Sequence, residues 1–368
     1  MISRARFLIL TAALAAAPLF GSTLAAQRHF PSDAAIRAIL DDQVTSKGTV
    51  GLVLGVMEAD GSTRIFTAGR SGSTATLDGN TVFEIGSITK VFTTGLLADM
   101  ASRGEVALDD PVQKYLPNGV TVPTRNGKQI TLTNLAAVNS GLPRTPTNFR
   151  PADRSNPFAD YTVAQLYEFL NGYTLPRDIG AEYEYSNVGM GLLGHALGLR
   201  LGKSYIDAVD ERILTPLGMR STAITLTPAM QQHLAPGHNR EGAIVPNWDI
   251  PTLAGTGAIR STVNDMLKFL AANLDPSSKP LGAILATTHA ARTQTSSPAM
   301  SVGLGWHIRN APSGPIVWHN GGTGGYRAFM GFDPATKVGV VLLTNTAVSA
   351  DNIGFHLIKP ELPLTAAR

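Results

Sequence analysis

A serine and a lysine three positions apart are the residues of this sequence best suited to chemistry. Ser87 and Lys90 lie in the run Phe83-Glu84-Ile85-Gly86-Ser87-Ile88-Thr89-Lys90. On a helix, residues at i and i+3 share one face, so we expect the amine to lie within reach of the hydroxyl. A serine becomes nucleophilic when a neighbouring base accepts its proton, and lysine is such a base only if burial or nearby cations lower its pKa. The apolar residues 91–101 predict a buried helix, which would have that effect on Lys90.

A second candidate group is Tyr185-Ser186-Asn187, where a loop enters a glycine-rich helical segment. A phenol held near a lysine ammonium is expected to have a lowered pKa and could shuttle a proton. The Asn187 amide could orient either a substrate amide or the lysine. The structural alternative is an asparagine at a helix start beside a packed tyrosine.

The third candidate group is the end of an apolar strand at His319, followed by Asn320 and the glycine-rich residues 321–325. Glycines let a ligand or another backbone segment approach closely. The backbone N–H groups of Gly322 and Ser87 could together stabilise an oxyanion. A glycine-rich hairpin turn or a phosphate-binding nest would have the same composition.

Taken together and in this order, the three groups resemble the motifs of the penicillin-recognising serine hydrolases. The resemblance is to the class C β-lactamase group, which has Tyr-x-Asn as its second motif. Residues 97–112, 135–143 and 260–266 are also similar to that family. The resemblance therefore covers most of the chain after its N-terminus, and the agreement of motif order with the flanking residues makes it specific.

The resemblance implies a mechanism as well as a family. Ser87 would attack a carbonyl carbon, while Lys90 and Tyr185 would take and return its proton. The backbone N–H groups of Ser87 and Gly322 would hold the oxyanion, and Asn187 would orient the substrate and the lysine. Water would then hydrolyse the acyl-enzyme, so neither a metal nor an organic cofactor is expected.

Substrate-binding residues follow from the same resemblance: Asn187, His319, Asn320, Gly321, Gly322, Thr323 and Arg327. Class C β-lactamases usually have lysine where this chain has His319, and neutral histidine would attract a β-lactam carboxylate less strongly. They often have asparagine at the position of Gly324 and a tyrosine near Gly257, so efficient cephalosporin hydrolysis is not expected. Arg327 could meet a substrate carboxylate, or it could be a solvated strand arginine.

The elements that must position these residues predict an α+β fold. Strand patterns occur at both ends of the chain and helical patterns between them, which favours one antiparallel sheet built from both ends and flanked by helices. Residues 26–130 and 275–368 are expected to form the sheet lobe, and residues 131–274 an inserted, mainly helical lobe. Expected strands are 50–57, 63–67, 302–308, 315–320, 326–332 and 338–344, and the clearest helices are 32–42, 162–170, 188–201 and 351–358.

Two further patterns have structural explanations. Residues 189–194 match G-x-G-x-x-G, with Asp210 at the distance that a dinucleotide site would need. No buried strand precedes them, so close helix packing explains these glycines better. Asp99 on the buried helix is expected to be a hydrogen-bonded structural carboxylate.

The N-terminus predicts export. Residues 1–25 combine Arg4 and Arg6, an apolar stretch and small residues near a cleavage site, as secretory signal peptides do. Their removal would lower the formal net charge from +3 to +1, and no basic cluster suggests a nucleic-acid partner. The 368 residues contain no cysteine, so disulfides, thiolate catalysis and a lipoprotein anchor are excluded. We expect a periplasmic monomer without a stable membrane anchor.

Three functions remain open at this point. The first is a secreted serine hydrolase that acts on β-lactam amides, on D-Ala-D-Ala peptides of peptidoglycan, or on both. The second is a β-lactamase-like esterase for short acyl esters, against which the polar residues His319 and Asn320 argue mildly. The third is a penicillin-binding receptor that is acylated but does not hydrolyse the adduct.

Overall fold

A computed structural model describes residues 28–278 and 281–364. The predicted signal peptide, residues 1–25, lies outside the described residues. Within the described ranges, no helix has the length and apolar character needed to cross a bilayer.

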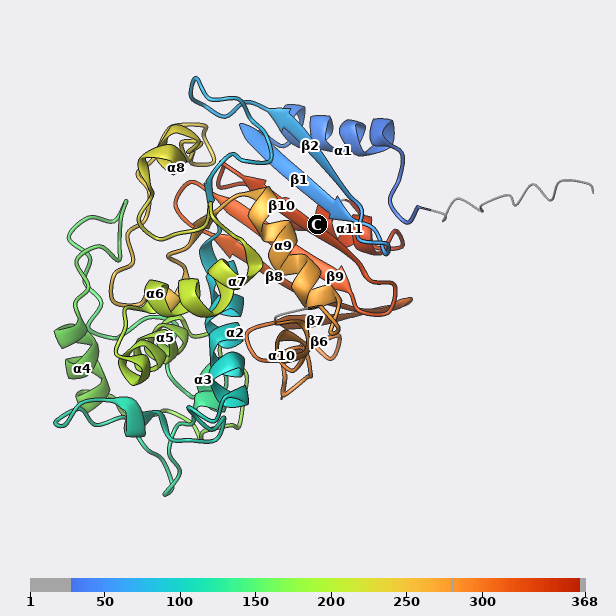
Figure 1. The fold of residues 1–368 in the computed structure, drawn as a ribbon. Coiled ribbons are helices and arrows are strands. Elements are labelled where there is room, and N and C mark those ends of the chain that lie inside the picture. The colour runs from blue at the N-terminus through green and yellow to red at the C-terminus, as the bar shows by residue number, and fades with distance from the viewer. Residues whose placement is uncertain (1–27, 279–280, 365–368) are drawn as a thin grey trace, which may run out of the picture.

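An eight-stranded antiparallel sheet forms the centre of the molecule, in the order β2-β1-β10-β9-β8-β7-β6-β5 (Figure 1). Its strands are β1 (Gly51–Met57), β2 (Thr63–Gly69), β5 (Thr293–Gln294), β6 (Met300–Val302), β7 (His307–Ala311), β8 (Gly314–Gly322), β9 (Arg327–Asp333) and β10 (Val338–Thr344). Strand β1 pairs with β2 on one side and with β10 on the other. The two ends of the chain therefore build one sheet, and the predicted α+β class is confirmed.

Helices cover both faces of this sheet. Helices α1 (Asp33–Thr45) and α11 (Asp351–Ile358) lie on one face, where Ile36, Leu40 and Phe355 pack with side chains of the sheet. Helix α9 (Val263–Leu274) packs against β1 and β10 on the other face, although its residues fall within the range predicted for the helical lobe. Helix α2 (Thr89–Ser102) belongs to the larger core on that side and is buried nearly all round, as expected.

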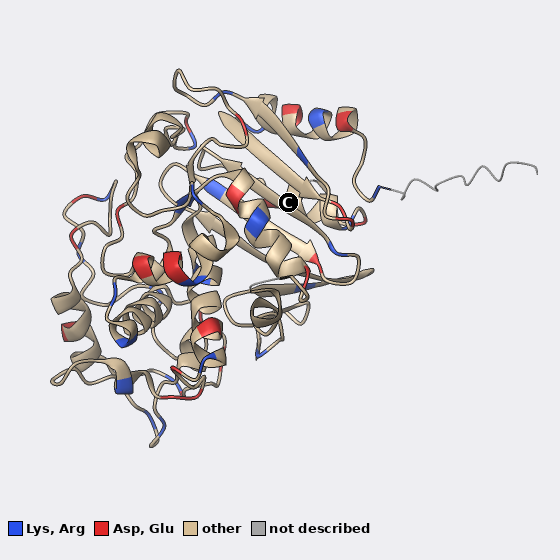
Figure 2. Ribbon diagram, viewed as in Figure 1, with Lys and Arg blue, Asp and Glu red and all other residues tan. Residues whose placement is uncertain are grey.

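Most of the remaining helices lie beside the sheet, whereas α10 (Gly282–Ala286) packs against α2 and α9. Those beside the sheet are α3 (Leu132–Ala136), α4 (Val163–Gly172), α5 (Asn187–Leu201), α6 (Tyr205–Val209), α7 (Thr215–Leu217) and α8 (Pro228–Gln232). Short 3₁₀ or π turns lie at η1 (Gly86–Ile88), η2 (Val112–Tyr115), η3 (Asp210–Leu214) and η4 (Ala254–Thr256). A separate two-stranded ladder joins β3 (Phe83–Glu84) to β4 (Arg260–Ser261). In Figure 2, basic and acidic residues are interspersed over the visible elements.

One predicted strand is wrong. Residues 302–308 do not form a single strand, because β6 ends at Val302 and β7 begins at His307. Gly305 between them has φ +75°, a conformation that breaks an extended chain. A Cβ at this position would lie 2.7 Å from the hydroxyl oxygen of Thr94 on α2, so a side chain there would also clash.

The G-x-G-x-x-G pattern is explained by packing within α5. A Cβ on Gly191 would lie 2.6 Å from the Leu253 side chain, and one on Gly194 would lie 3.0 Å from the Cα of Gly255. These glycines therefore let α5 approach the 253–256 segment closely, as the sequence indicated.

Candidate active site

The turn η1 presents Ser87 at the start of the buried helix α2. Gly86, with φ +50°, redirects the chain from β3 into this turn, and the N–H of Ile85 donates to the Ile259 carbonyl at 3.1 Å. Ser87 is partly exposed, whereas its neighbours Gly86 and Ile88 are buried. The fold therefore leaves the hydroxyl accessible while it fixes the backbone around it.

Lys90 meets Ser87 as the spacing predicts. Its Nζ donates to Ser87 Oγ at 2.8 Å and to the Thr256 carbonyl at 2.7 Å. Only 1% of Lys90 is exposed. Burial, and after it the charge of Arg144, holds the pKa of Lys90 well below 10.5. A neutral amine is thereby favoured, and at this distance it can accept the serine proton.

Tyr185 completes the group, although its pKa contradicts the expectation. Lys90 Nζ lies 4.9 Å from the centre of the phenol ring. Desolvation raises the pKa of Tyr185 to about 12, and it outweighs the opposing effects of the Ser87 hydroxyl and the Arg144 charge. The predicted lowering of this pKa is wrong, because burial of the phenol has the largest effect on it. Tyr185 thus keeps its proton at neutral pH.

The backbone of Gly321 and Gly322 presses against the turn that bears Ser87. A Cβ on Gly321 would lie 1.9 Å from the Ile85 carbonyl oxygen and 3.0 Å from the Ser87 nitrogen. A Cβ on Gly86 would lie 2.6 Å from the Gly322 nitrogen. The glycines therefore permit the close approach that an oxyanion site between Ser87 and Gly322 requires. The binding of an oxyanion by these two backbone N–H groups stays a prediction.

Three other predicted residues have distinct surroundings. Asn187 begins α5, and its Oδ1 accepts a hydrogen bond from Thr256 Oγ1 at 3.0 Å. Because Lys90 donates to the Thr256 carbonyl, Thr256 connects Asn187 to Lys90. Asn320 donates through Nδ2 to Asp351 at the start of α11, at 2.6 Å. Thr323 is only 4% exposed, and its hydroxyl has no partner among the described residues. A buried hydroxyl without a partner is free to bond to a substrate.

His319 lies behind the site rather than in it. It is 1% exposed, its Nδ1 lies 2.6 Å from the Asn320 carbonyl, and its ring centre lies 4.9 Å from that of His307. Burial, with smaller contributions from His307 and Lys90, lowers the pKa of His319 far below its usual value. His319 does not line either pocket described below, so its contact with substrate stays a prediction.

Arg327 lies at the edge of the site with part of its side chain exposed. Its Nη1 donates to the carbonyls of Thr323 at 2.8 Å and Tyr326 at 2.7 Å. Arg327 is therefore held by backbone acceptors and is not a freely solvated strand arginine.

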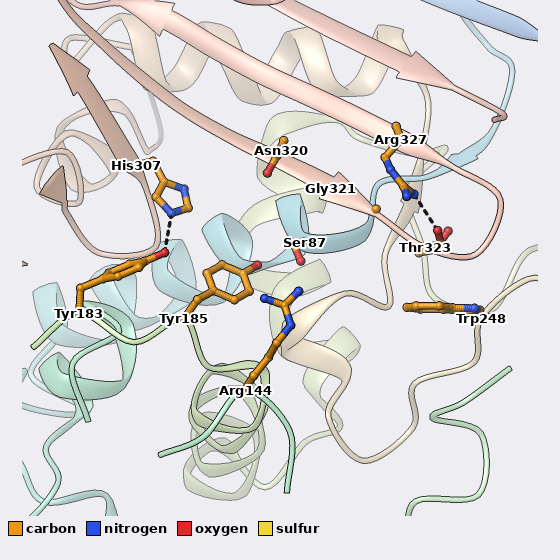
Figure 3. Close-up of a pocket in the computed structure, with 11 residues that line it drawn as sticks. Ser87, Arg144, Tyr183, Tyr185, Trp248, His307, Asn320, Gly321, Thr323 and Arg327 are labelled. Atoms are coloured by element: carbon orange, nitrogen blue, oxygen red, sulfur yellow. Dashed lines mark hydrogen bonds between the residues drawn. The ribbon is translucent and has the colours of Figure 1, made fainter. Parts of the chain in front are cut away.

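Two adjoining pockets meet at Ser87. The larger, of about 490 Å³, is shown in Figure 3 and is lined by Ser87, Arg144, Tyr183, Tyr185, Trp248, His307, Asn320, Gly321, Gly322, Thr323 and Arg327. The smaller, of about 210 Å³, is lined by Gly86, Ser87, Arg144, Thr145, Phe158, Asn187, Trp248, Ile250, Thr256, Gly257, Gly322 and Thr323. Ser87 is thus open to a ligand that extends in two directions.

No cluster of metal-ligating side chains occurs among the described residues.

Four residues that line the larger pocket were not predicted from the sequence: Arg144, Tyr183, Trp248 and His307. Arg144 directly follows the family-like run at residues 135–143, which could have drawn attention to it. Tyr183 and His307 face each other, with the phenol oxygen 3.3 Å from His307 Nε2, although 124 residues separate them. Since no local pattern relates such distant residues, the sequence held no signal for this pair.

A buried carboxylate positions Trp248. Glu84, 3% exposed, accepts hydrogen bonds from the Trp248 N–H at 2.9 Å and from Arg260 at 3.2 Å. The Trp248 indole N–H donates to the Ser155 carbonyl at 3.0 Å, which ties this segment to the loop after Pro143. A Cβ on Gly324 would lie 2.9 Å from the indole nitrogen. Trp248 therefore occupies the space into which an asparagine at Gly324 would project.

Comparison with known proteins agrees with this geometry. The family model Beta-lactamase matches residues 36–358. The chain belongs to the beta-lactamase family. The D-alanyl-D-alanine-carboxypeptidase/endopeptidase AmpH of Escherichia coli (strain K12) is 31% identical over 361 residues, covering 92% of this chain and 91% of AmpH. A Beta-lactamase of Pseudomonas fluorescens is 26% identical, covering 84% and 93% of the two chains.

Solved structures of this family have the same fold. A Beta-lactamase/D-alanine carboxypeptidase from Yersinia pestis superposes with a TM-score of 0.77 at 26% identity, covering 90% of this chain and 99% of that one. A class C beta lactamase from Rhodobacter sphaeroides gives 0.73 at 25% identity, with coverage of 86% and 95%. This beta-lactamase-family chain is therefore a serine hydrolase of the β-lactamase/DD-peptidase type, as its resemblance implied.

Proposed function

We propose that the protein forms an acyl-enzyme on Ser87 and hydrolyses D-Ala-D-Ala peptides of peptidoglycan, β-lactam amides, or both. The observation that carries this proposal is the 2.8 Å contact between Ser87 Oγ and a lysine amine that is almost fully buried. A charged, solvated lysine could not accept the serine proton at neutral pH, whereas a desolvated one can. The relatives named above include peptidases and β-lactamases, which supports both substrate classes.

Acylation follows from the arrangement of these groups. Ser87 Oγ attacks the substrate carbonyl carbon as its proton passes to Lys90 Nζ. The carbonyl oxygen takes up negative charge against the backbone N–H groups of Ser87 and Gly322. The bond to the leaving nitrogen then breaks, and that nitrogen receives a proton through Tyr185, which Lys90 replenishes. In the second half of the reaction, water attacks the ester and the proton returns to Ser87.

Intact-protein mass spectrometry tests the proposal. The protein without residues 1–25 would be mixed with benzylpenicillin and sampled over time, beside assays with nitrocefin, a D-Ala-D-Ala peptide and p-nitrophenyl acetate. We expect an adduct of one penicillin mass that is absent in Ser87→Ala. Decay of the adduct with nitrocefin turnover identifies a β-lactamase, and a long-lived adduct with peptide turnover identifies a DD-peptidase. Rapid ester cleavage without any adduct would contradict the proposal and favour the esterase.

We also propose that the protein works in the periplasm, where residues 1–25 would direct it. The charge and apolar pattern of those residues supports export. Mass analysis of the protein recovered from a periplasmic fraction is expected to show a chain that begins after residue 25. Recovery of the full-length chain in the cytoplasm would contradict this proposal.

A further inference from the structure

The two directions from Ser87 have different chemical roles. Figure 3 shows Tyr183, Tyr185 and His307 on one side of Ser87, and Trp248 and Thr323 on the other. Because Tyr185 is the proton donor to the leaving nitrogen, the leaving group must lie on the tyrosine side. The acyl part of the substrate then extends toward Trp248 and Thr323 and along the smaller pocket, which Asn187 and Arg144 both line.

Positive charge is concentrated around this opening. Neither pocket has an aspartate or glutamate among its described lining residues, but Arg144 lines both and Arg327 lines the larger one. Arg327 already donates to two carbonyls. Burial lowers the pKa of Arg327, and the nearby charge of Asp351 acts in the opposite direction. Arg144 has no such partner, because no carboxylate within the described ranges lies at ion-pair distance from it.

The backbone of Arg144 is fixed although its side chain is exposed. Its carbonyl accepts the N–H of Asn187 at 2.9 Å, and the preceding carbonyl of Pro143 accepts the Ser186 hydroxyl at 2.7 Å. The guanidinium carbon lies 5.1 Å from the centre of the Tyr185 ring. Figure 3 shows this guanidinium directed toward Ser87. Anchoring and stacking thus present a planar cation beside the nucleophile without a protein anion to neutralise it.

We propose that Arg144 is a specificity-determining residue that pairs with a carboxylate on the acyl part of the substrate. The inference rests on the proposed acylation of Ser87 and deepens it, since it names the substrate class: peptides or β-lactams whose acyl portion carries a free carboxylate near the scissile carbonyl. A guanidinium fork binds a carboxylate through two parallel hydrogen bonds, which gives direction as well as attraction.

A matched pair of penicillins tests the inference. Carbenicillin is benzylpenicillin with one additional carboxylate on the acyl side chain, so the ring carboxylate is common to both. The measured quantity is the ratio of their second-order acylation rates. For Arg144→Gln we expect the carbenicillin-to-benzylpenicillin ratio to fall about tenfold, which corresponds to about 1.4 kcal/mol. The ratio removes any effect of the lost charge on Lys90, because that effect is the same for both compounds.

Two further variants separate recognition from general charge. Arg150 is exposed on the same loop, bonds only to local carbonyls and lines neither pocket, so Arg150→Gln should leave the ratio unchanged. Arg144→Lys keeps the charge but not the fork, and an intermediate ratio is expected. An unchanged ratio in Arg144→Gln, or an equal change in Arg150→Gln, would overturn the inference.

An ester pair distinguishes failure of the inference from failure of the proposed function. Mono-p-nitrophenyl succinate carries a carboxylate on its acyl part, whereas p-nitrophenyl butyrate does not. If the penicillins leave Ser87 unmodified but Arg144→Gln selectively slows the succinate ester, the proposed function is wrong and the role of Arg144 stands. If the esters also show no Arg144-dependent ratio, the inference is overturned.

Discussion

At Lys90 the proposed catalytic role and the stability of the fold oppose each other. An amine that is 1% exposed loses hydration, and its low pKa is the measure of that loss. Lys90→Met should reduce acylation by at least about 10³-fold. It should also raise the Tm by roughly 2 °C or more, because the apolar side chain suits the buried position. Thermal unfolding beside the penicillin adduct assay checks both outcomes, and a lower Tm would contradict the stability argument.

The gain in stability should depend on pH. In the unfolded chain Lys90 has its ordinary pKa of about 10.5, above the folded value, so the unfolded state binds more protons between the two values. The difference in unfolding free energy between Lys90→Met and wild type is therefore greatest below the folded pKa of Lys90. It should shrink as the pH rises toward about 10.5.

Activity should also depend on the protonation of Lys90. Below its folded pKa the amine is charged and cannot accept the Ser87 proton, so kcat/KM should fall as the pH decreases through that value. Arg144 contributes to the low pKa of Lys90, so Arg144→Gln should move this acid limb to higher pH while Arg144→Lys leaves it in place. A pH profile of kcat/KM with a neutral ester measures the shift. An identical acid limb in all three proteins would contradict it.

At the scale of elements, the β3–β4 ladder holds the wall of the active site. Glu84 on β3 joins Arg260 on β4 to the backbone of Trp248. Glu84→Gln would leave the buried guanidinium with the exposed Asp249, 3.4 Å away, as its remaining carboxylate partner, and should lower the unfolding free energy by about 3 kcal/mol. Glu211→Gln is the control, because Glu211 is about half exposed in its pair with Lys203, and its loss should cost less than about 0.5 kcal/mol. Urea unfolding distinguishes the two.

The loop bearing Trp248 also explains why glycine stands at position 324. Gly324→Asn should displace the indole and lower kcat/KM for penicillins about tenfold, because the new Cβ would lie 2.9 Å from Trp248 Nε1. In a Trp248→Ala background the same change should have little further effect. Gly172→Ala, where no atom lies within 4 Å of the added Cβ, is the steric control. Additive losses in the double variant would argue against the clash.

Much of the element pattern was predictable because it is local. Strand β10 was predicted with its observed limits, and the hairpin of β1 and β2 turns at Asp60 and Gly61 as expected. The Ser87–Lys90 contact followed from the i, i+3 spacing alone. What could not be predicted arises between distant segments: Thr256 accepts from Lys90, and the burial that raises the pKa of Tyr185 depends on the assembled fold.

At the scale of the whole molecule, the sheet depends on a pairing between the two ends of the chain. Each residue of β1 from Leu52 to Met57 faces a residue of β10. A chain truncated after residue 337 lacks β10 and α11, and it should remain unfolded and sensitive to protease. A chain that ends at residue 364 keeps every described element and should resist protease as the full chain does. Comparable resistance in both truncations would contradict the importance of this pairing.

The same pairing sets the time at which the protein can fold during its synthesis. While the ribosome makes residues 70–337, the hairpin of β1 and β2 has no third strand, and an isolated hairpin is only marginally stable in water. The sheet can close only after residues 338–344 have emerged, near the end of translation. For most of its synthesis the nascent chain therefore cannot complete its sheet, and an incompletely folded polypeptide is one that can be threaded through a narrow channel.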